Sequence, residues 1–237
     1  MKEKTLGILG GVGPLATAYF MEMIIKMTDA DRDQDHISMI VTNHPSIPDR
    51  TDYIFDKSKP NPLPVMIEDA KKLENAGSDY IVIPCNTAHF FYDEIQKCVK
   101  IPVLNIIEET VKYAKNTFKD TKQIGILGTK GTLASGSYRK VCEKYNIKYA
   151  QPDENAQNEL MEIIYGQIKA GKKPDFEGFM RIVEGMKNDG CDAVILGCTE
   201  LSVIKHDFDI NRKDIIDSME VLAKSAILKC DKKIKCR

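Results

Sequence analysis

Two cysteines, Cys85 and Cys198, each end a short apolar run and are each followed by two polar residues, Asn86-Thr87 and Thr199-Glu200. An ionised thiol is a strong base, and a helix N-terminus directly after a strand stabilises its negative charge. An unperturbed thiol with a pKa of about 8.5 is only ~3% ionised at pH 7. This placement therefore predicts lowered thiol pKa values and proton abstraction near neutral pH.

The surroundings of the two cysteines are repeated along the chain. Residues 77–85 resemble residues 190–198, and Leu6-Gly7-Ile8-Leu9-Gly10 resembles Ile124-Gly125-Ile126-Leu127-Gly128. Such self-similarity indicates an internal duplication. A lone cysteine that ends an apolar strand is more often a buried structural residue, but a duplicated one is a better candidate for chemistry. The remaining cysteines have no counterpart in the other half and are expected to be inert.

Short apolar strands alternate with helical segments, which predicts an α/β fold with parallel sheets and a ligand site beyond the carboxyl ends of the strands. We expect two pseudo-symmetric lobes, each a parallel sheet flanked by helices, with the active site in the cleft between them. The first lobe is predicted to span residues 1–106, completed by a C-terminal helix within 211–230. The second lobe is predicted to span residues 107–210.

Several segments carry specific expectations. Residues 43–64 contain five prolines and little periodicity, so a long loop over the site is predicted. Helical periodicity predicts single helices over residues 87–99, 132–145, 158–170 and 213–230. The apolar N-terminal run is interrupted by Gly10-Gly11-Val12-Gly13-Pro14 and its first strand recurs later, so it is interpreted as a first strand and not as a secretory leader.

The bulk composition excludes some classes of partner. A formal net charge of −1 and 29% charged residues favour neither nucleic acid nor a membrane surface. Seven cysteines are an odd number without regular close spacing, which is atypical of a disulfide framework. A reducing, cytoplasmic location is therefore expected. A homodimer is expected because it is the commonest closed assembly.

Three motifs in the same chain resemble the aspartate/glutamate racemase family: Gly10-Gly11-Val12-Gly13-Pro14, Pro84-Cys85-Asn86-Thr87-Ala88-His89 and Gly197-Cys198-Thr199-Glu200-Leu201. The resemblance covers nearly the whole chain. The resemblance is closer to the aspartate branch. Glutamate racemases usually carry a histidine after the second Cys-Thr, where this chain has Glu200, and an acidic residue in the opening loop, where it has Gly10-Gly11. The family implies two α/β lobes and racemisation without pyridoxal phosphate, another cofactor or a metal.

By this resemblance Cys85 and Cys198 are the acid and base on opposite faces of the substrate α-carbon. Inversion through a planar carbanion does need one group to remove the proton and another to return it from the other side. Turnover requires one thiolate and one thiol, and repulsion between two nearby anions favours that mixed state. The titrations of the two thiols are therefore expected to be coupled.

The resemblance also points to residues that bind an acidic amino acid. Arg50 and Lys169 are implied to hold its side-chain carboxylate, because an arginine fork matches a carboxylate. The other substrate-binding candidates are polar residues in the turns that follow strands: Asn86, Thr87, Thr129, Thr199 and Glu200. Their hydroxyl and N–H groups are suited to stabilise developing negative charge, although each of the turn residues is equally suited to cap a helix.

Other readings remain open from the residues alone. The glycine-rich turn also resembles a dinucleotide-binding fingerprint, but the second strand does not end at the acid that a ribose requires. Cys85 activated by His89 would suggest an amidase, a decarboxylase or a cis-trans isomerase. A non-catalytic protein that binds acidic amino acids is a further alternative. The choice between aspartate and glutamate is not decided by the sequence.

Overall fold

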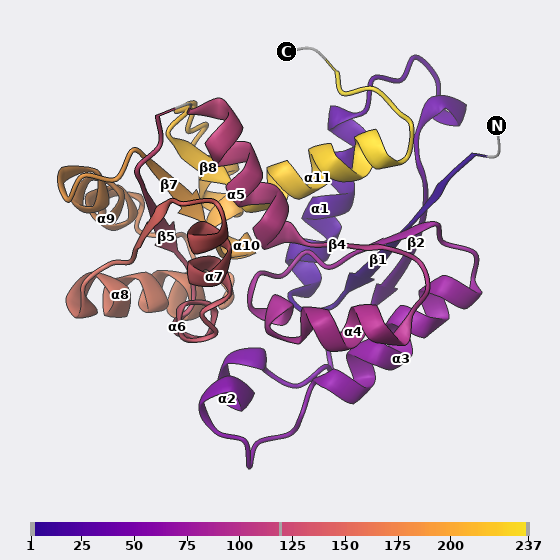
Figure 1. The fold of residues 1–237 in the computed structure, drawn as a ribbon, viewed down its shortest axis with the longest axis horizontal. Coiled ribbons are helices and arrows are strands. Elements are labelled where there is room, and N and C mark those ends of the chain that lie inside the picture. Colours follow the sequence, from indigo (N-terminus) through magenta and orange to yellow (C-terminus); the bar gives the residue numbers. More distant parts are fainter. Residues whose placement is uncertain (1–2, 119, 236–237) are drawn as a thin grey trace.

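The computed structural model describes residues 3–118 and 120–235 and contains two four-stranded parallel sheets with helices on both faces (Figure 1). The first sheet has the order β2 (Ser38–Asn43), β1 (Thr5–Gly10), β3 (Tyr80–Val82), β4 (Val103–Leu104). The second has the matching order β6 (Lys148–Ala150), β5 (Gln123–Leu127), β7 (Ala193–Leu196), β8 (Ile215–Asp217). The predicted fold class, with two similar parallel lobes, is confirmed.

Helices cover both faces of each sheet. From residue 14 to residue 117 they are α1 (Pro14–Met27), η1 (Asp33–Asp35), α2 (Arg50–Phe55), α3 (Leu63–Asn75), η2 (Thr87–Phe91), α4 (Tyr92–Cys98) and α5 (Ile106–Thr117). The remainder are α6 (Lys130–Ala134), α7 (Ser137–Lys144), α8 (Glu154–Met161), η3 (Glu162–Ile168), α9 (Phe176–Asn188), α10 (Thr199–Asp207) and α11 (Ser218–Lys229). No helix within the described residues is long and apolar enough to cross a membrane.

Three expected single helices are divided, and the expected loop contains a helix. Gly136, with a φ of 69°, separates α6 from α7, because the left-handed region suits glycine and ends a helix. The helix expected over residues 158–170 begins at Glu154 and continues as the π-helix η3. The segment after Cys85 is a 3₁₀ helix before it becomes α4. Within residues 43–64, α2 starts at Arg50 after an Asp49 cap.

The C-terminal segment differs from the expected helix over residues 213–230. It first forms β8, which pairs with β7, so the second sheet extends past residue 210. Asp217 then caps α11, as Asn105 caps α5, each by accepting two backbone N–H groups. Helix α11 packs against α1 and α5, and α5 packs against α7. The proposed lobe boundaries remain a prediction.

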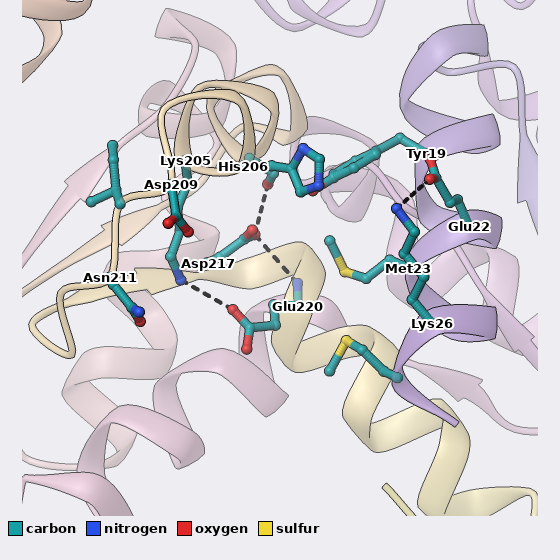
Figure 2. A pocket seen from close by; sticks show the side chains of 13 residues that line it. Tyr19, Glu22, Met23, Lys26, Lys205, His206, Asp209, Asn211, Asp217 and Glu220 are labelled. Atoms are coloured by element: carbon teal, nitrogen blue, oxygen red, sulfur yellow. Dashed lines mark hydrogen bonds and ion pairs between the residues drawn. The ribbon is translucent and has the colours of Figure 1, made fainter. Parts of the chain in front are cut away.

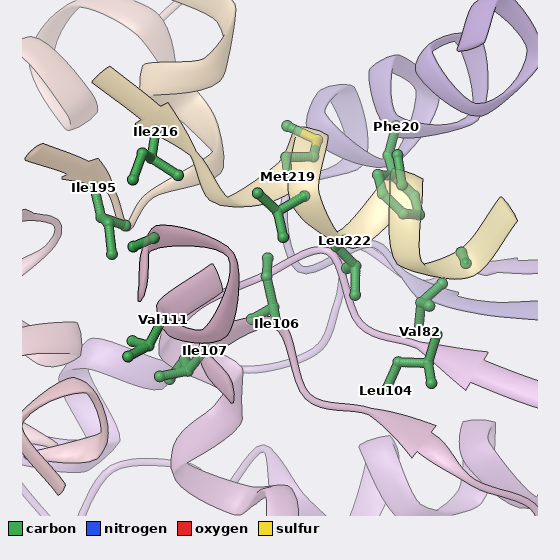
Figure 3. Close-up of a cluster of buried hydrophobic side chains, with 14 of the residues drawn as sticks. Phe20, Val82, Leu104, Ile106, Ile107, Val111, Ile195, Ile216, Met219 and Leu222 are labelled. Atoms are coloured by element: carbon green, nitrogen blue, oxygen red, sulfur yellow. The ribbon is translucent and has the colours of Figure 1, made fainter. Parts of the chain in front are cut away.

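A cluster of buried hydrophobic residues is shared by both lobes (Figure 3). Val82 and Leu104 come from the first sheet, Ile195 and Ile216 from the second, and Leu222 of α11 lies between them. Two further clusters lie on the outer sides, under α3 and α4 in one lobe and under α8 and α9 in the other. The two lobes are therefore joined by a common interior and not by a linker alone.

Candidate active site

All nine candidate residues line one small cavity between the lobes, beyond the carboxyl ends of the strands. They are Arg50, Cys85, Asn86, Thr87, Thr129, Lys169, Cys198, Thr199 and Glu200. Cys85 follows β3, Cys198 follows β7, and Thr129 follows β5. Because the parallel strands of both sheets direct their carboxyl ends towards the cleft, turns that are distant in the sequence meet there. The two cysteines thus face the same space.

The cavity volume is about 10 Å³, close to the space that one water molecule needs. An amino acid requires more room than this, so the cavity as described is smaller than a substrate. A larger pocket of about 390 Å³, here called the vestibule, lies beside the glycine-rich turn and the start of α1. Arg50, Lys169 and Glu200 line both the cavity and the vestibule. These three charged residues therefore stand at the boundary between the two spaces.

Cys85 lies in a turn that His89 braces. The Ile106 N–H donates to His89 Nε2 at 3.1 Å, so Nδ1 carries the ring hydrogen and donates to the Cys85 carbonyl at 2.8 Å. Burial lowers the pKa of His89 to about 4, which keeps the ring neutral. Both ring nitrogens of His89 therefore form hydrogen bonds with backbone groups. His89 is thus not placed to take a proton from the Cys85 thiol, which argues against a Cys85–His89 nucleophile.

Cys198 stands at the N-cap position of α10 without a side-chain cap, and its thiol donates to Glu200 Oε2 at 2.9 Å. Burial and the negative charge of Glu200 raise the pKa of Cys198 well above its ordinary value, although Lys169 opposes this. The lowered pKa expected from the helix N-terminus is therefore wrong for Cys198. Desolvation and a neighbouring carboxylate outweigh the helix dipole, and the thiol is held in its protonated form.

Two cations flank the cavity. Arg50 is only 8% exposed, and its Nη atoms donate to the backbone carbonyls of Pro48 and Val12 at 3.1 and 3.3 Å, while its buried Nε has no partner among the described residues. Lys169 Nζ lies 3.8 Å from Glu200 Oε1. Burial works against both charges, but nearby acidic groups, including Cys85 for Arg50 and Glu200 for Lys169, raise their pKa values. Both side chains stay charged.

Asn86 joins the first lobe to the second. Its side-chain amide donates to Ser218 Oγ at 2.9 Å, and its oxygen accepts from the Tyr138 hydroxyl at 2.7 Å. Ser218 in turn donates to the Leu196 carbonyl at 2.6 Å, at the end of β7. Asn86 therefore anchors the turn after Cys85 against the other lobe, with both ends of its amide engaged.

Three cavity residues were not anticipated from the sequence: Val12, Thr51 and Tyr165. The Thr51 hydroxyl lies 3.4 Å from Thr129 Oγ1, and the Tyr165 hydroxyl lies 3.4 Å from Thr51 Oγ1. Lys169 Nζ sits 4.1 Å from the centre of the Tyr165 ring. A signal was available for two of them, because Thr51 follows Arg50 directly and Tyr165 precedes Lys169 by about one helical turn.

A separate pocket of about 190 Å³ lies between α1, α10 and α11, and none of the nine candidates lines it (Figure 2). Its charges are largely paired with one another: Lys205 with Glu220 at 3.0 Å, and Lys26 with Glu22 at 2.6 Å. Asp217 accepts from Ser202 and serves as the cap of α11. Since these contacts satisfy the charged groups, the smaller cavity with two thiols remains the candidate active site.

Comparisons with known proteins give a family and a fold. The family model described as Asp/Glu/Hydantoin racemase matches residues 9–226. The chain is 32% identical over 232 residues to the broad specificity amino-acid racemase RacX of Bacillus subtilis (strain 168), covering 94% of this chain and 96% of that protein. The solved structure of Picrophilus torridus aspartate racemase is similar with a TM-score of 0.84 at 35% identity, covering 98% of this chain and 96% of that one. An aspartate racemase homologue from Pyrococcus horikoshii OT3 gives 0.78 at 25%, covering 96% and 99%.

Proposed function

This chain belongs to the Asp/Glu/hydantoin racemase family and is an amino-acid racemase, and from that premise we propose that it interconverts the enantiomers of an acidic amino acid by proton transfer between Cys85 and Cys198. One observation carries the proposal: the two cysteines come from equivalent strand ends of two similar lobes and line the same cavity. Such a pair offers a proton carrier from each lobe to one bound α-carbon.

The proposed reaction needs no external co-reactant. A thiolate on one face removes the α-proton, the electron pair stays on a planar carbanion conjugated with the α-carboxylate, and the opposite thiol returns a proton to the other face. Cys198 is the proton donor in the arrangement described, because its thiol keeps its hydrogen and donates it in a hydrogen bond to Glu200. Cys85, on the Arg50 side of the cavity, is then the base. The reverse direction exchanges these roles. The chemistry is thus independent of pyridoxal phosphate.

The charges around the cavity favour an acidic substrate. Arg50 and Lys169 supply two positive charges, and Glu200 supplies one negative charge. This set complements an amino acid with two carboxylates and one ammonium group. We assign the side-chain carboxylate to Arg50, whose Nε has no described partner, and the ammonium group to Glu200. The α-carboxylate is assigned to Thr87, Thr129 and Thr199. Aspartate is the first substrate to test and glutamate the second.

The test is deuterium incorporation at Cα. L- and D-forms of aspartate, glutamate and several neutral amino acids are incubated with the protein in deuterated water without added cofactor, and are then analysed on a chiral column with mass detection. We expect label in both enantiomers of an acidic amino acid. Binding without label would indicate a non-catalytic binding protein instead.

The cysteine variants test the two-base assignment in the same assay. Cys85→Ala and Cys198→Ala each remove the proton carrier on one face, so each should abolish racemisation. Cys191→Ala is the matched control, because it also removes a buried thiol but lies outside the cavity. Racemisation at the wild-type rate in either cavity variant would refute the assignment of two bases.

A further inference from the structure

Three threonine hydroxyls form a buried triangle behind the cavity. Thr132 Oγ1 lies 2.8 Å from Thr87 Oγ1 and 3.1 Å from Thr129 Oγ1, and the last two lie 3.1 Å apart. Thr87 comes from the first lobe, whereas Thr129 and Thr132 belong to the second. Thr87 and Thr129 line the cavity, but Thr132 does not. Thr132, which is only 1% exposed, therefore acts on the cavity through the other two.

The hydrogen bonds of this triangle have a limited set of directions. A hydroxyl donates one hydrogen and accepts at two lone pairs. Among the described residues, the Thr132 hydroxyl has hydrogen-bond partners only in Thr87 and Thr129. Thr129 Oγ1 also accepts the backbone N–H of Thr132 at 3.1 Å and lies 3.4 Å from the hydroxyl of Thr51. Thr129 Oγ1 thus accepts from two donors, and its own hydroxyl hydrogen can be donated to another group.

We propose that Thr132 is a positioning residue that directs the hydroxyl hydrogens of Thr87 and Thr129 towards a carboxylate bound in the cavity. Its hydroxyl donates to Thr87, and its backbone N–H donates to Thr129. Without a ligand, the Thr129 hydrogen stays within the triangle, in its contact with Thr132 or Thr87. With a carboxylate bound, each cavity threonine keeps an internal donor and turns its own hydrogen towards the ligand. This inference rests on the proposed racemase function, in which those two threonines hold the substrate α-carboxylate.

The effect is expected to be larger in the transition state than in the ground state. Removal of the α-proton increases the negative charge on the α-carboxylate, so donors already aimed at that group stabilise the carbanion most. A hydroxyl that itself accepts a hydrogen bond is also a stronger donor, because linked hydrogen bonds polarise one another. Loss of the Thr132 hydroxyl should therefore lower kcat/KM, with kcat affected at least as much as KM.

Thr132→Val and Thr132→Ser separate the hydroxyl from the shape of the side chain. Valine keeps the branched shape and the backbone N–H but removes the hydroxyl, whereas serine keeps the hydroxyl. We expect kcat/KM to fall about tenfold in Thr132→Val, the effect of losing one well-aligned hydrogen bond, and to stay within about twofold of wild type in Thr132→Ser. Rates are measured in both directions by chiral analysis, with thermal unfolding recorded for each variant.

Thr28→Val is the matched control. Thr28 is also buried, and its hydroxyl donates to the Ile24 carbonyl at 2.7 Å at the end of α1, away from the cavity. It should lose stability without a change in kcat/KM. Thr132→Ala serves as a second variant that lacks the hydroxyl, in case valine does not fold.

The possible results distinguish the proposed racemase function from the positioning role of Thr132. An inactive wild type would contradict the proposed function itself. An active wild type with unchanged kinetics in Thr132→Val, or with equal losses in the valine and serine variants, would contradict only the positioning role. Failure of both Thr132→Val and Thr132→Ala to fold would make Thr132 a structural residue and would likewise overturn the inference.

Discussion

Cys85 and Cys198 occupy equivalent places in the two lobes, but their charged neighbours differ. Cys198 donates to a carboxylate oxygen of Glu200 at 2.9 Å, which favours the thiol. Cys85 instead shares its side of the cavity with the charged guanidinium of Arg50, whose raised pKa reflects in part the nearby Cys85. In the proposed two-base reaction, Glu200 and Arg50 would therefore supply the initial asymmetry between the two thiols.

Glu200→Gln tests this asymmetry. Glutamine keeps the size and a hydrogen-bond acceptor but removes the negative charge that raises the pKa of Cys198, so that pKa should fall. A thiol with a lower pKa ionises at lower pH. The thiolate absorbance near 240 nm, measured during pH titration in a Cys85→Ala background, should therefore rise at lower pH than without the Glu200 change.

Glu159→Gln is the control for that titration, because Glu159 pairs with Arg181 on the surface and does not line the cavity. The signal is assigned to Cys198 by subtracting the same titration of the variant that lacks both cavity cysteines. A midpoint that is unchanged, or that moves to higher pH, would contradict the role given to Glu200.

At the scale of elements, α2 lines the cavity and packs against α6. Helix α2 supplies Arg50 and Thr51, and α6 supplies Gly131, which lies directly against Thr51. A Cβ atom at position 131 would lie 2.6 Å from Thr51 Oγ1 and 2.9 Å from Thr51 Cα. Contacts this short are not tolerated, so the absence of a side chain at Gly131 allows α2 to approach the second lobe.

Gly131→Ala should push α2 away from α6 and displace Arg50. Because misplacement of a binding group by about 1 Å can cost on the order of 100-fold in rate, kcat/KM should fall by at least about tenfold. Gly185→Ala in α9 is the control, since a Cβ there meets nothing within 4 Å and alanine should stabilise the helix by about 0.5–1 kcal/mol. Wild-type kinetics in Gly131→Ala would show that this close approach is not required.

At the scale of the whole molecule, the lobes share one interior cluster built around α5 and α11. Helix α11 follows the last strand of the second sheet but packs against α1 of the first lobe. Leu222 in α11 is fully buried in this cluster. An arrangement of this kind couples the stability of the two lobes, so they are expected to unfold together.

Leu222→Ala should lower the free energy of unfolding by roughly 2–5 kcal/mol while the protein still unfolds in a single transition. Calorimetry and urea denaturation monitored by two optical probes measure both quantities. Leu228→Ala in the same helix is the control, because Leu228 is 58% exposed and its loss should change stability by no more than about 0.5 kcal/mol. Two separate transitions in the Leu222 variant would contradict the coupling of the lobes.

The sequence was sufficient to predict nine of the twelve residues that line the cavity, but not all of the elements that hold them. The strands that precede Cys85 and Cys198 are apolar runs that recur, which made both visible. Helix α2 has six residues and β8 has three, too few for a periodic pattern, so the first was predicted as loop and the second as helix. Thr51 and Tyr165 were missed even though each is a near neighbour of a predicted residue, Arg50 or Lys169, along the chain.

The amino-acid sequence by itself determined the α/β class, the repeated lobes and the placement of a cysteine at the end of one strand in each, because these depend on periodicity and on neighbours along the chain. The tertiary structure decided which distant side chains meet, how small the cavity is and where the Cys198 proton lies. Those properties depend on burial and on charges brought close through space. The raised pKa of Cys198 is the clearest case. It depends on burial and on the Glu200 carboxylate, which lies against the thiol, and the sequence does not show where that carboxylate points.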